Sequence, residues 1–337
     1  MKRVVWLGLL AVGLMNLALA PGLTTALPAE PGALAPQIGL QAATPTPNPY
    51  AGLAIDDLAR RSYGGGLFTA VEPMQTQATE YTRYLVRYPS DGLNVYGFMN
   101  VPVGEGPYPV VIVIHGYVDP RIYDTLAYTT RYANALARAG YLTIHPNLRG
   151  YGLSDDGPNP FRIGFAIDIL NLIALIREQG GRPGPLEHAD PERIGLWGHS
   201  MGGGISIRVL TVSPDVRAAV LYGSMSADER QNHERIVYWS GGTRGREELN
   251  TPPDVMRTIS PVYHLDRIRA AVSIHHGRND EQVPLAWSED LCQRLQALNR
   301  PVECFTYAEQ PHTFVDAGDR LFIRRTVDFF DAHLRRP

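Results

Sequence analysis

The hexapeptide Gly198-His199-Ser200-Met201-Gly202-Gly203 separates two stretches of different character. It follows the apolar run 193–197 and precedes the run 205–212, which is compatible with a helix. A Gly-x-Ser-x-Gly pattern between a strand and a helix is typical of a nucleophile elbow, a sharp turn that exposes the serine hydroxyl at the edge of a sheet. The flanking glycines permit the turn, because a Cβ atom at either position would collide with neighbouring backbone. The pattern therefore predicts an α/β fold with Ser200 as a nucleophile.

A serine hydroxyl needs a general base, and the base needs an acid that orients it. The run 271–275 reads as a buried strand, and Asp280 lies in the turn-rich loop after it. The next strand-like run, 302–307, leads into a loop that contains His312. After such an elbow the expected chain order is serine, acid, histidine. We therefore predict Asp280 as the acid and His312 as the base.

The other acids and histidines near these positions fit less well. Glu281 adjoins Asp280 and is expected to point elsewhere, and Asp290 falls inside a helix predicted over 285–298. Asp316 and Asp319 follow His312 and so break the chain order. His275 and His276 end a strand and are expected to pack locally, and His333 lies on the terminal helix predicted over about 320–334.

Two backbone amides are predicted to hold the negative charge that develops on a reacting carbonyl oxygen. The amide of Met201 lies at a helix N-terminus, where N–H groups can point at an anion. The second donor is expected in the loop after an earlier strand. The apolar, β-branched run 109–114 is typical of a strand buried on both faces, and His115-Gly116-Tyr117 follows it directly. The Tyr117 amide is the predicted partner, and the Tyr117 ring is a candidate for lining the pocket.

Strand-like and helix-like runs alternate along the rest of the chain. This alternation indicates a mostly parallel sheet with helices on both faces, with reactive groups beyond the carboxyl ends of the strands. The first two strands are expected to be antiparallel. The predicted strands cover 81–88, 95–101, 110–114, 141–145 and 218–221, and the predicted helices cover 123–138 and 164–178.

The polar segment 224–258 interrupts this alternation. We predict a small lid that shapes the pocket; the alternative is an ordinary surface excursion. Tyr238 and Trp239 then either face the substrate or form the core of the lid. Arg149 is expected to brace the loop beside the oxyanion site, and a role in binding a substrate carboxylate is its alternative.

These motifs, in this order, resemble the α/β-hydrolase superfamily. The chain is similar in particular to the hydrolase domain of prolyl oligopeptidase-like and dienelactone hydrolase-like proteins, over about residues 80–335. Further matching motifs are Asn147-Leu148-Arg149-Gly150-Tyr151-Gly152-Leu153-Ser154, Ser260-Pro261 and His276-Gly277. The resemblance implies a hydrolase without a cofactor that acts through an acyl-enzyme.

One departure bears on the substrate. Prolyl oligopeptidase-type peptidases usually carry a large β-propeller ahead of this domain, and about 80 residues are too few for several blades. We therefore expect cleavage of small carboxylic esters. An aminopeptidase-like or acylaminoacyl-peptidase-like activity on short peptides is the alternative, and a noncatalytic surface binding module is a third interpretation.

Composition and the N-terminus indicate where the enzyme works. Hydrophobic residues make up 44% of the chain and charged residues 19%, which favours a sizeable core over disorder. No basic stretch interleaves with aromatics, which argues against nucleic acid as a partner. Lys2 and Arg3 precede the apolar run 4–20, as in a signal peptide or membrane anchor. We predict a secreted, periplasmic or cell-surface protein, with the signal or anchor over 1–26, a Pro-rich linker over 27–50 and the catalytic domain over 51–337.

The chain has two cysteines, Cys292 and Cys304. In an exported protein they can form a disulfide, and the sequence leaves open whether they do. Without a CxxC pair they do not resemble a metal site.

Overall fold

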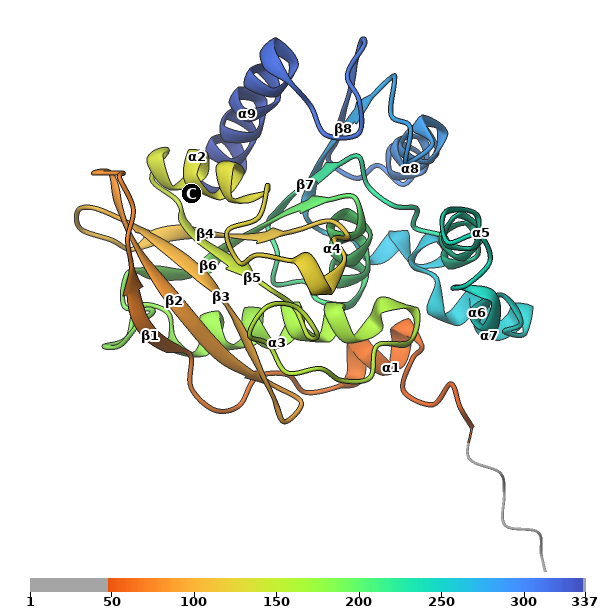
Figure 1. Ribbon diagram of the computed structural model, residues 1–337, viewed down its shortest axis with the longest axis horizontal. Helices are drawn as coiled ribbons and strands as arrows, with labels where there is room; N and C mark the ends of the chain where they lie inside the picture. Colours follow the sequence, from red (N-terminus) through yellow and green to blue (C-terminus); the bar gives the residue numbers. More distant parts are fainter. Residues whose placement is uncertain (1–47, 336–337) are drawn as a thin grey trace, which may run out of the picture. The chain divides into compact units, whose positions relative to one another are not determined.

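The computed structural model describes residues 48–335, so the predicted signal or anchor and nearly all of the predicted linker lie outside the described residues. A nine-stranded sheet forms its centre, in the order β1-β2-β3-β5-β4-β6-β7-β8-β9 (Figure 1). The strands are β1 (Thr69–Met74), β2 (Tyr81–Ser90), β3 (Leu93–Pro102), β4 (Tyr108–Ile114), β5 (Leu142–Pro146), β6 (Ala189–His199), β7 (Ala218–Tyr222), β8 (Ala271–Gly277) and β9 (Val302–Tyr307). The pairs β1–β2, β2–β3 and β3–β5 are antiparallel, and from β5 through β4, β6, β7, β8 and β9 the pairs are parallel. The predicted sheet, with its antiparallel start, is confirmed.

Helices cover both faces of this sheet. They are α1 (Ile55–Arg60), α2 (Thr130–Arg138), α3 (Ile163–Gln179), α4 (Met201–Val212), α5 (Glu229–Trp239), α6 (Arg246–Leu249), α7 (Pro253–Ile259), α8 (Leu285–Ala297) and α9 (Asp316–Phe330). Among the residues described, no helix has the length and apolar character needed to cross a membrane.

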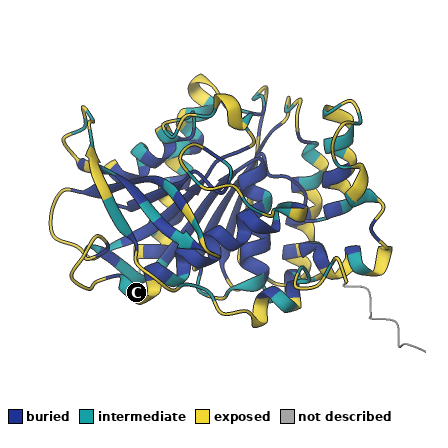
Figure 2. Ribbon diagram, turned by 60° about the horizontal axis from the view of Figure 1, so that its bottom comes forward, coloured by how far each residue is buried: buried dark blue, intermediate teal, exposed yellow. Residues whose placement is uncertain are grey.

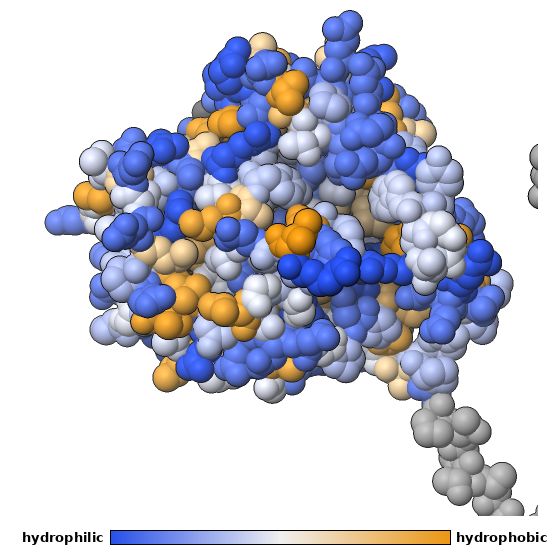
Figure 3. Space-filling view, viewed as in Figure 1, coloured by the Kyte–Doolittle hydropathy of each residue, from blue (hydrophilic) through white to orange (hydrophobic). Residues whose placement is uncertain are grey.

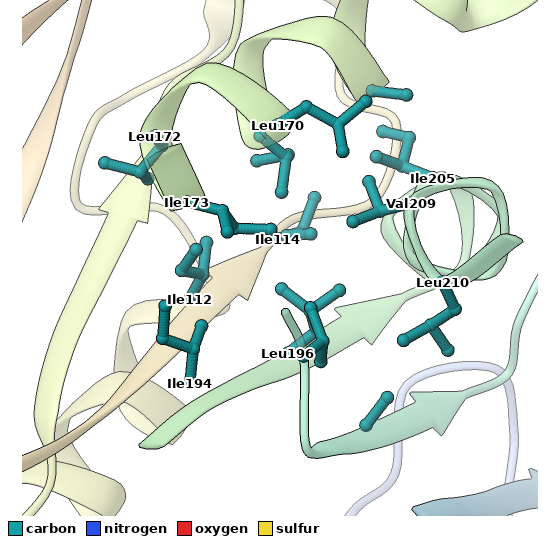
Figure 4. Close-up of a cluster of buried hydrophobic side chains, with 14 of the residues drawn as sticks. Ile112, Ile114, Leu170, Leu172, Ile173, Ile194, Leu196, Ile205, Val209 and Leu210 are labelled. Carbon is teal, nitrogen blue, oxygen red and sulfur yellow. The ribbon is translucent and has the colours of Figure 1, made fainter. Parts of the chain in front are cut away.

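The sequence of β4 shows why helices pack on both faces of the sheet. Successive side chains of a strand point to opposite faces. Ile112 and Ile114 accordingly join the core under α3, α4 and α8, whereas Val111 and Val113 join the core under α2 and α9 (Figure 4 shows the first of these). The central strands are therefore buried on both sides, and exposed residues lie on the outer helix faces, the loops and the edge strands β1 and β9 (Figure 2).

The helix expected over 123–138 begins later than its sequence suggests, at Thr130. Side chains of the preceding segment are instead held by distant groups: the Tyr123 hydroxyl donates to Asn147 Oδ1 at 3.1 Å, and Thr129 Oγ1 lies 2.7 Å from His145 Nε2. These tertiary contacts outweigh local helix propensity. The two cysteines form a disulfide that ties α8 to β9, with Cα atoms 6.5 Å apart, which answers the question that the sequence left open.

Two fully buried histidines make the fold sensitive to acid. Burial lowers the pKa of His145 and of His275 to about 3, and a histidine in the unfolded chain titrates near 6.5. The folded state thus binds fewer protons, so stability is complete above about pH 6.5 and is lost as the pH falls towards 3. We expect each histidine to cost about 2 kcal/mol of unfolding free energy at pH 5.

Urea unfolding at pH 7.5 and at pH 5 measures this loss. A His275→Gln variant should be less stable at pH 7.5 but should lose less stability on acidification. Equal unfolding free energies at the two pH values in the parent protein would contradict the prediction.

Candidate active site

Ser200 occupies a strained turn between β6 and α4. Its backbone dihedrals are φ 55° and ψ −115°, a conformation that non-glycine residues rarely adopt. A Cβ atom on Gly198 would collide with the carbonyl oxygen of Gly202, and one on Gly202 would collide with the carbonyl oxygen of Ile114. The collisions expected at both glycines are therefore confirmed, and the turn presents Ser200 beyond the carboxyl end of β6.

Asp280 and His312 meet at the same edge of the sheet, in the loops that follow β8 and β9. His312 Nδ1 lies 2.7 Å from Asp280 Oδ2, and the two side chains are 4% and 1% exposed. The other carboxylate oxygen, Oδ1, accepts hydrogen bonds from the backbone N–H groups of Gln282 and Val283, both at 2.8 Å. Because a proton on Nδ1 is donated to the carboxylate, the Nε2 atom of neutral His312 is free to accept a proton.

Hydrogen bonding keeps the Asp280 carboxylate charged. Burial alone raises the pKa of Asp280, but hydrogen bonds from His276 and His312 outweigh it and hold that pKa well below its ordinary value. His276 Nε2 lies 3.1 Å from Asp280 Oδ2, and Nδ1 lies 2.7 Å from Ser288 Oγ. His276 therefore does more than pack locally, and its place at the end of β8 was the signal that could have indicated this.

Glu281 also contacts the loop that carries His312. Its Oε2 atom accepts a hydrogen bond from the backbone N–H of His312 at 3.3 Å. Glu281 therefore contacts the main chain of His312, whereas the imidazole contacts Asp280.

The candidate nucleophile and the candidate base share a cavity of about 1000 Å³. Ser200 and His312 both line it, together with Tyr117 and Met201. Volumes of this order fall at the upper end of small-molecule sites. The face seen in Figure 3 is predominantly hydrophilic, and its apolar residues appear in separate groups. The remaining apolar and aromatic lining residues are Pro120, Tyr128, Tyr151, Phe161, Phe165, Met225, Ile236 and Trp239.

The segment predicted as a lid forms α5, α6 and α7, which lie together beside the sheet (Figure 1). Trp239 lines the cavity, whereas Tyr238 is 73% exposed and its ring lies under the Arg235 guanidinium, 4.9 Å from it. The structure thus places Tyr238 outside the pocket for which it was a candidate.

Arginines attach this segment to the loops around the cavity. Arg235 donates to the carbonyl oxygens of Gln282 and Glu281 at 2.8 and 3.0 Å, and Arg244 donates to the Tyr117 hydroxyl at 2.7 Å. Arg149 lines the cavity as well, but its guanidinium is buried against Asp168, with Nη2 2.8 Å from Asp168 Oδ1.

The two candidate oxyanion amides adjoin Ser200. Among the hydrogen bonds of residues 48–335, neither the Tyr117 nor the Met201 backbone N–H has an acceptor. A Cβ atom added to Gly116 would lie 3.1 Å from Ser200 Cβ, so the loop that carries Tyr117 passes directly beside the serine. Both amides are thus free of other acceptors among residues 48–335.

A family model and several known proteins are similar to this chain. A family model described as the alpha/beta hydrolase fold matches residues 109–264. The uncharacterized peptidase YuxL of Bacillus subtilis (strain 168) is 24% identical over 253 residues, which cover 72% of this chain but only 38% of YuxL. The chain therefore spans well under half of that relative.

Two solved structures share the fold. An acetyl xylan esterase from Paenibacillus sp. R4 has a TM-score of 0.59 at 19% identity, covering 83% of this chain and 92% of the esterase. An acylaminoacyl peptidase from Pyrococcus horikoshii has the same TM-score and identity, covering 82% of this chain and 51% of the peptidase. The family match over residues 109–264, together with the nine-stranded sheet and the elbow, shows that the chain has the alpha/beta hydrolase fold.

Proposed function

We propose that this α/β hydrolase cleaves carboxylic esters through an acyl-enzyme formed on Ser200. One observation carries the proposal: Ser200 on its strained turn lines the same cavity as His312, whose ring is hydrogen-bonded to Asp280. His312 takes the proton of the Ser200 hydroxyl as the hydroxyl oxygen attacks the ester carbonyl carbon.

The remaining groups complete the reaction. The Tyr117 and Met201 amides donate to the oxyanion of the tetrahedral intermediate. His312 then gives its proton to the departing alkoxide, which leaves the acyl group on Ser200. Water, deprotonated by His312, attacks the acyl-enzyme; His312 then returns the proton to Ser200 Oγ as the acid leaves. Asp280 keeps His312 in the required tautomer and stabilises the imidazolium that forms in each step.

Esters are favoured because an alkoxide is a better leaving group than the amide anion that a peptide would expel, so an ester makes the smaller demand on the proton donor. Peptides remain the alternative, since the relatives with this fold include a peptidase as well as an esterase. The size of the cavity supports acyl or alcohol groups larger than acetyl or methyl.

The proposal is tested by comparing purified protein on p-nitrophenyl acyl esters and on aminoacyl p-nitroanilides. We expect a much higher kcat/KM for the esters. The opposite ratio would assign a peptidase. If the protein neither turns over any substrate nor reacts with a fluorophosphonate, the chain is a noncatalytic binding module and the proposal fails.

A further inference from the structure

His199, the residue before the candidate nucleophile, is buried between the catalytic elements. Its ring centroid lies 4.6 Å from that of His312 and 4.3 Å from that of Tyr222. Its Nε2 atom lies 3.1 Å from the backbone carbonyl oxygen of His312, and its Nδ1 atom lies 2.7 Å from the Tyr128 hydroxyl. His199 therefore contacts the main chain of the candidate base, and nothing in the mechanism above uses it.

The partners determine where each proton lies. A carbonyl oxygen only accepts, so His199 Nε2 carries the hydrogen. Burial lowers the pKa of His199 well below its ordinary value, so the ring is neutral and Nδ1 is an acceptor. The single hydroxyl hydrogen of Tyr128 is then donated to Nδ1, and the Tyr128 oxygen accepts from the backbone N–H of Gly116 at 3.0 Å. A directed chain of hydrogen bonds thus runs from Gly116 through Tyr128 and His199 to His312.

This chain of hydrogen bonds also constrains the amide that is proposed to serve the oxyanion. The Gly116 N–H is occupied by Tyr128, and the Gly116 carbonyl oxygen faces the ring of His115, 2.7 Å from Nδ1. In a planar trans peptide the C=O and the next N–H point in opposite directions. The Tyr117 N–H therefore points away from His115, and it has no acceptor among residues 48–335.

We propose that His199 and Tyr128 are positioning residues. They hold two loops against the nucleophile elbow: the loop that carries Gly116 and Tyr117, and the loop that carries His312. The inference rests on the proposed function. Fixing the Gly116 N–H orients the adjoining Tyr117 amide, and fixing the His312 carbonyl limits movement of the imidazole. Donors and bases that are already oriented need no reorganisation when charge develops in the transition state.

The decisive variant is Tyr128→Phe, which removes one oxygen and keeps the ring. We expect kcat for ester hydrolysis to fall about 10- to 100-fold with little change in KM, because misplaced groups act on the transition state more than on substrate binding. Rates are expressed per active site titrated with a fluorophosphonate. A merely structural role would reduce the number of titratable sites and leave kcat per site unchanged.

Further variants test the direction of the chain. The Gln side chain in His199→Gln can still donate an N–H towards the His312 carbonyl, so this variant should retain more kcat per site than His199→Ala. Adding Tyr128→Phe to His199→Ala should cost much less than it does alone, since both act through one chain. The matched control is Tyr63→Phe, which makes the same chemical change outside the cavity and removes a phenol hydrogen bond of 2.8 Å to the Leu58 carbonyl oxygen; its kcat should be unchanged.

Two results would overturn the inference: an unchanged kcat per titrated site in Tyr128→Phe, or losses that multiply in the double variant. If the parent protein is active and these results appear, only the positioning role fails. If the parent protein itself shows neither turnover nor labelling, the proposed function fails and the positioning role fails with it.

Discussion

Replacing Ser200 with alanine is expected to lower kcat for ester hydrolysis by about 10⁴- to 10⁶-fold, which is the scale seen when a serine nucleophile is removed from a hydrolase triad. The loss is large because the acyl-enzyme forms on the Ser200 hydroxyl oxygen, which alanine lacks. Alanine keeps the Cβ atom, so the turn between β6 and α4 should persist and the melting temperature should change little. Hydrolysis rates, fluorophosphonate labelling and thermal unfolding measure the three quantities together.

A suitable control is Ser273→Ala. Ser273 is also buried, but it lies within β8, where its hydroxyl contacts His275 and Glu303 rather than the cavity. This variant should keep full labelling and turnover. Labelling of Ser200→Ala at the parental rate would show that another residue is the nucleophile.

The arrangement of the sheet could be predicted wherever burial left a pattern in the sequence. The run that forms β4 is apolar because both faces of that strand are covered. Runs of this kind made the alternating order of strands and helices predictable. Strand β1 left no such pattern. It pairs only with β2 at the edge of the sheet, has no buried residue and contains Pro73, so hydrophobic periodicity could not indicate it.

For the candidate site, the sequence could indicate residues whose place follows from topology. Asp280 and His312 were identified because each follows the end of a strand, and the carboxyl ends of parallel strands share one edge. The contact between Tyr128 and His199 depends instead on how the loop before α2 packs over β6, 71 residues away. Neither residue type nor spacing marks such a contact. Arg244 is similar, since its link to Tyr117 depends on the position of α5 and α6.

Replacing Asp280 with asparagine is expected to lower kcat by about 10⁴-fold, which is the cost of the equivalent change in a well-studied serine protease. The carboxylate accepts from His312 Nδ1, but an amide NH₂ at the same place would donate to that atom and stabilise the tautomer with the proton on Nε2. His312 could then no longer accept the Ser200 proton. Fluorophosphonate labelling should become slow but reach completion, because the nucleophile is still present.

The matched control for this change is Asp290→Asn. Asp290 is an exposed acid on α8, and its partner is Arg294 at 2.7 Å, so the same chemical change there should leave kcat unaltered. Because hydrogen bonds hold the pKa of Asp280 well below its ordinary value, the difference between the two variants should persist as the assay pH is lowered towards 5. Near-parental kcat in a folded, fully titratable Asp280→Asn protein would remove Asp280 from the mechanism. Glu281, whose carboxylate contacts the His312 main chain, would then be the acid to test.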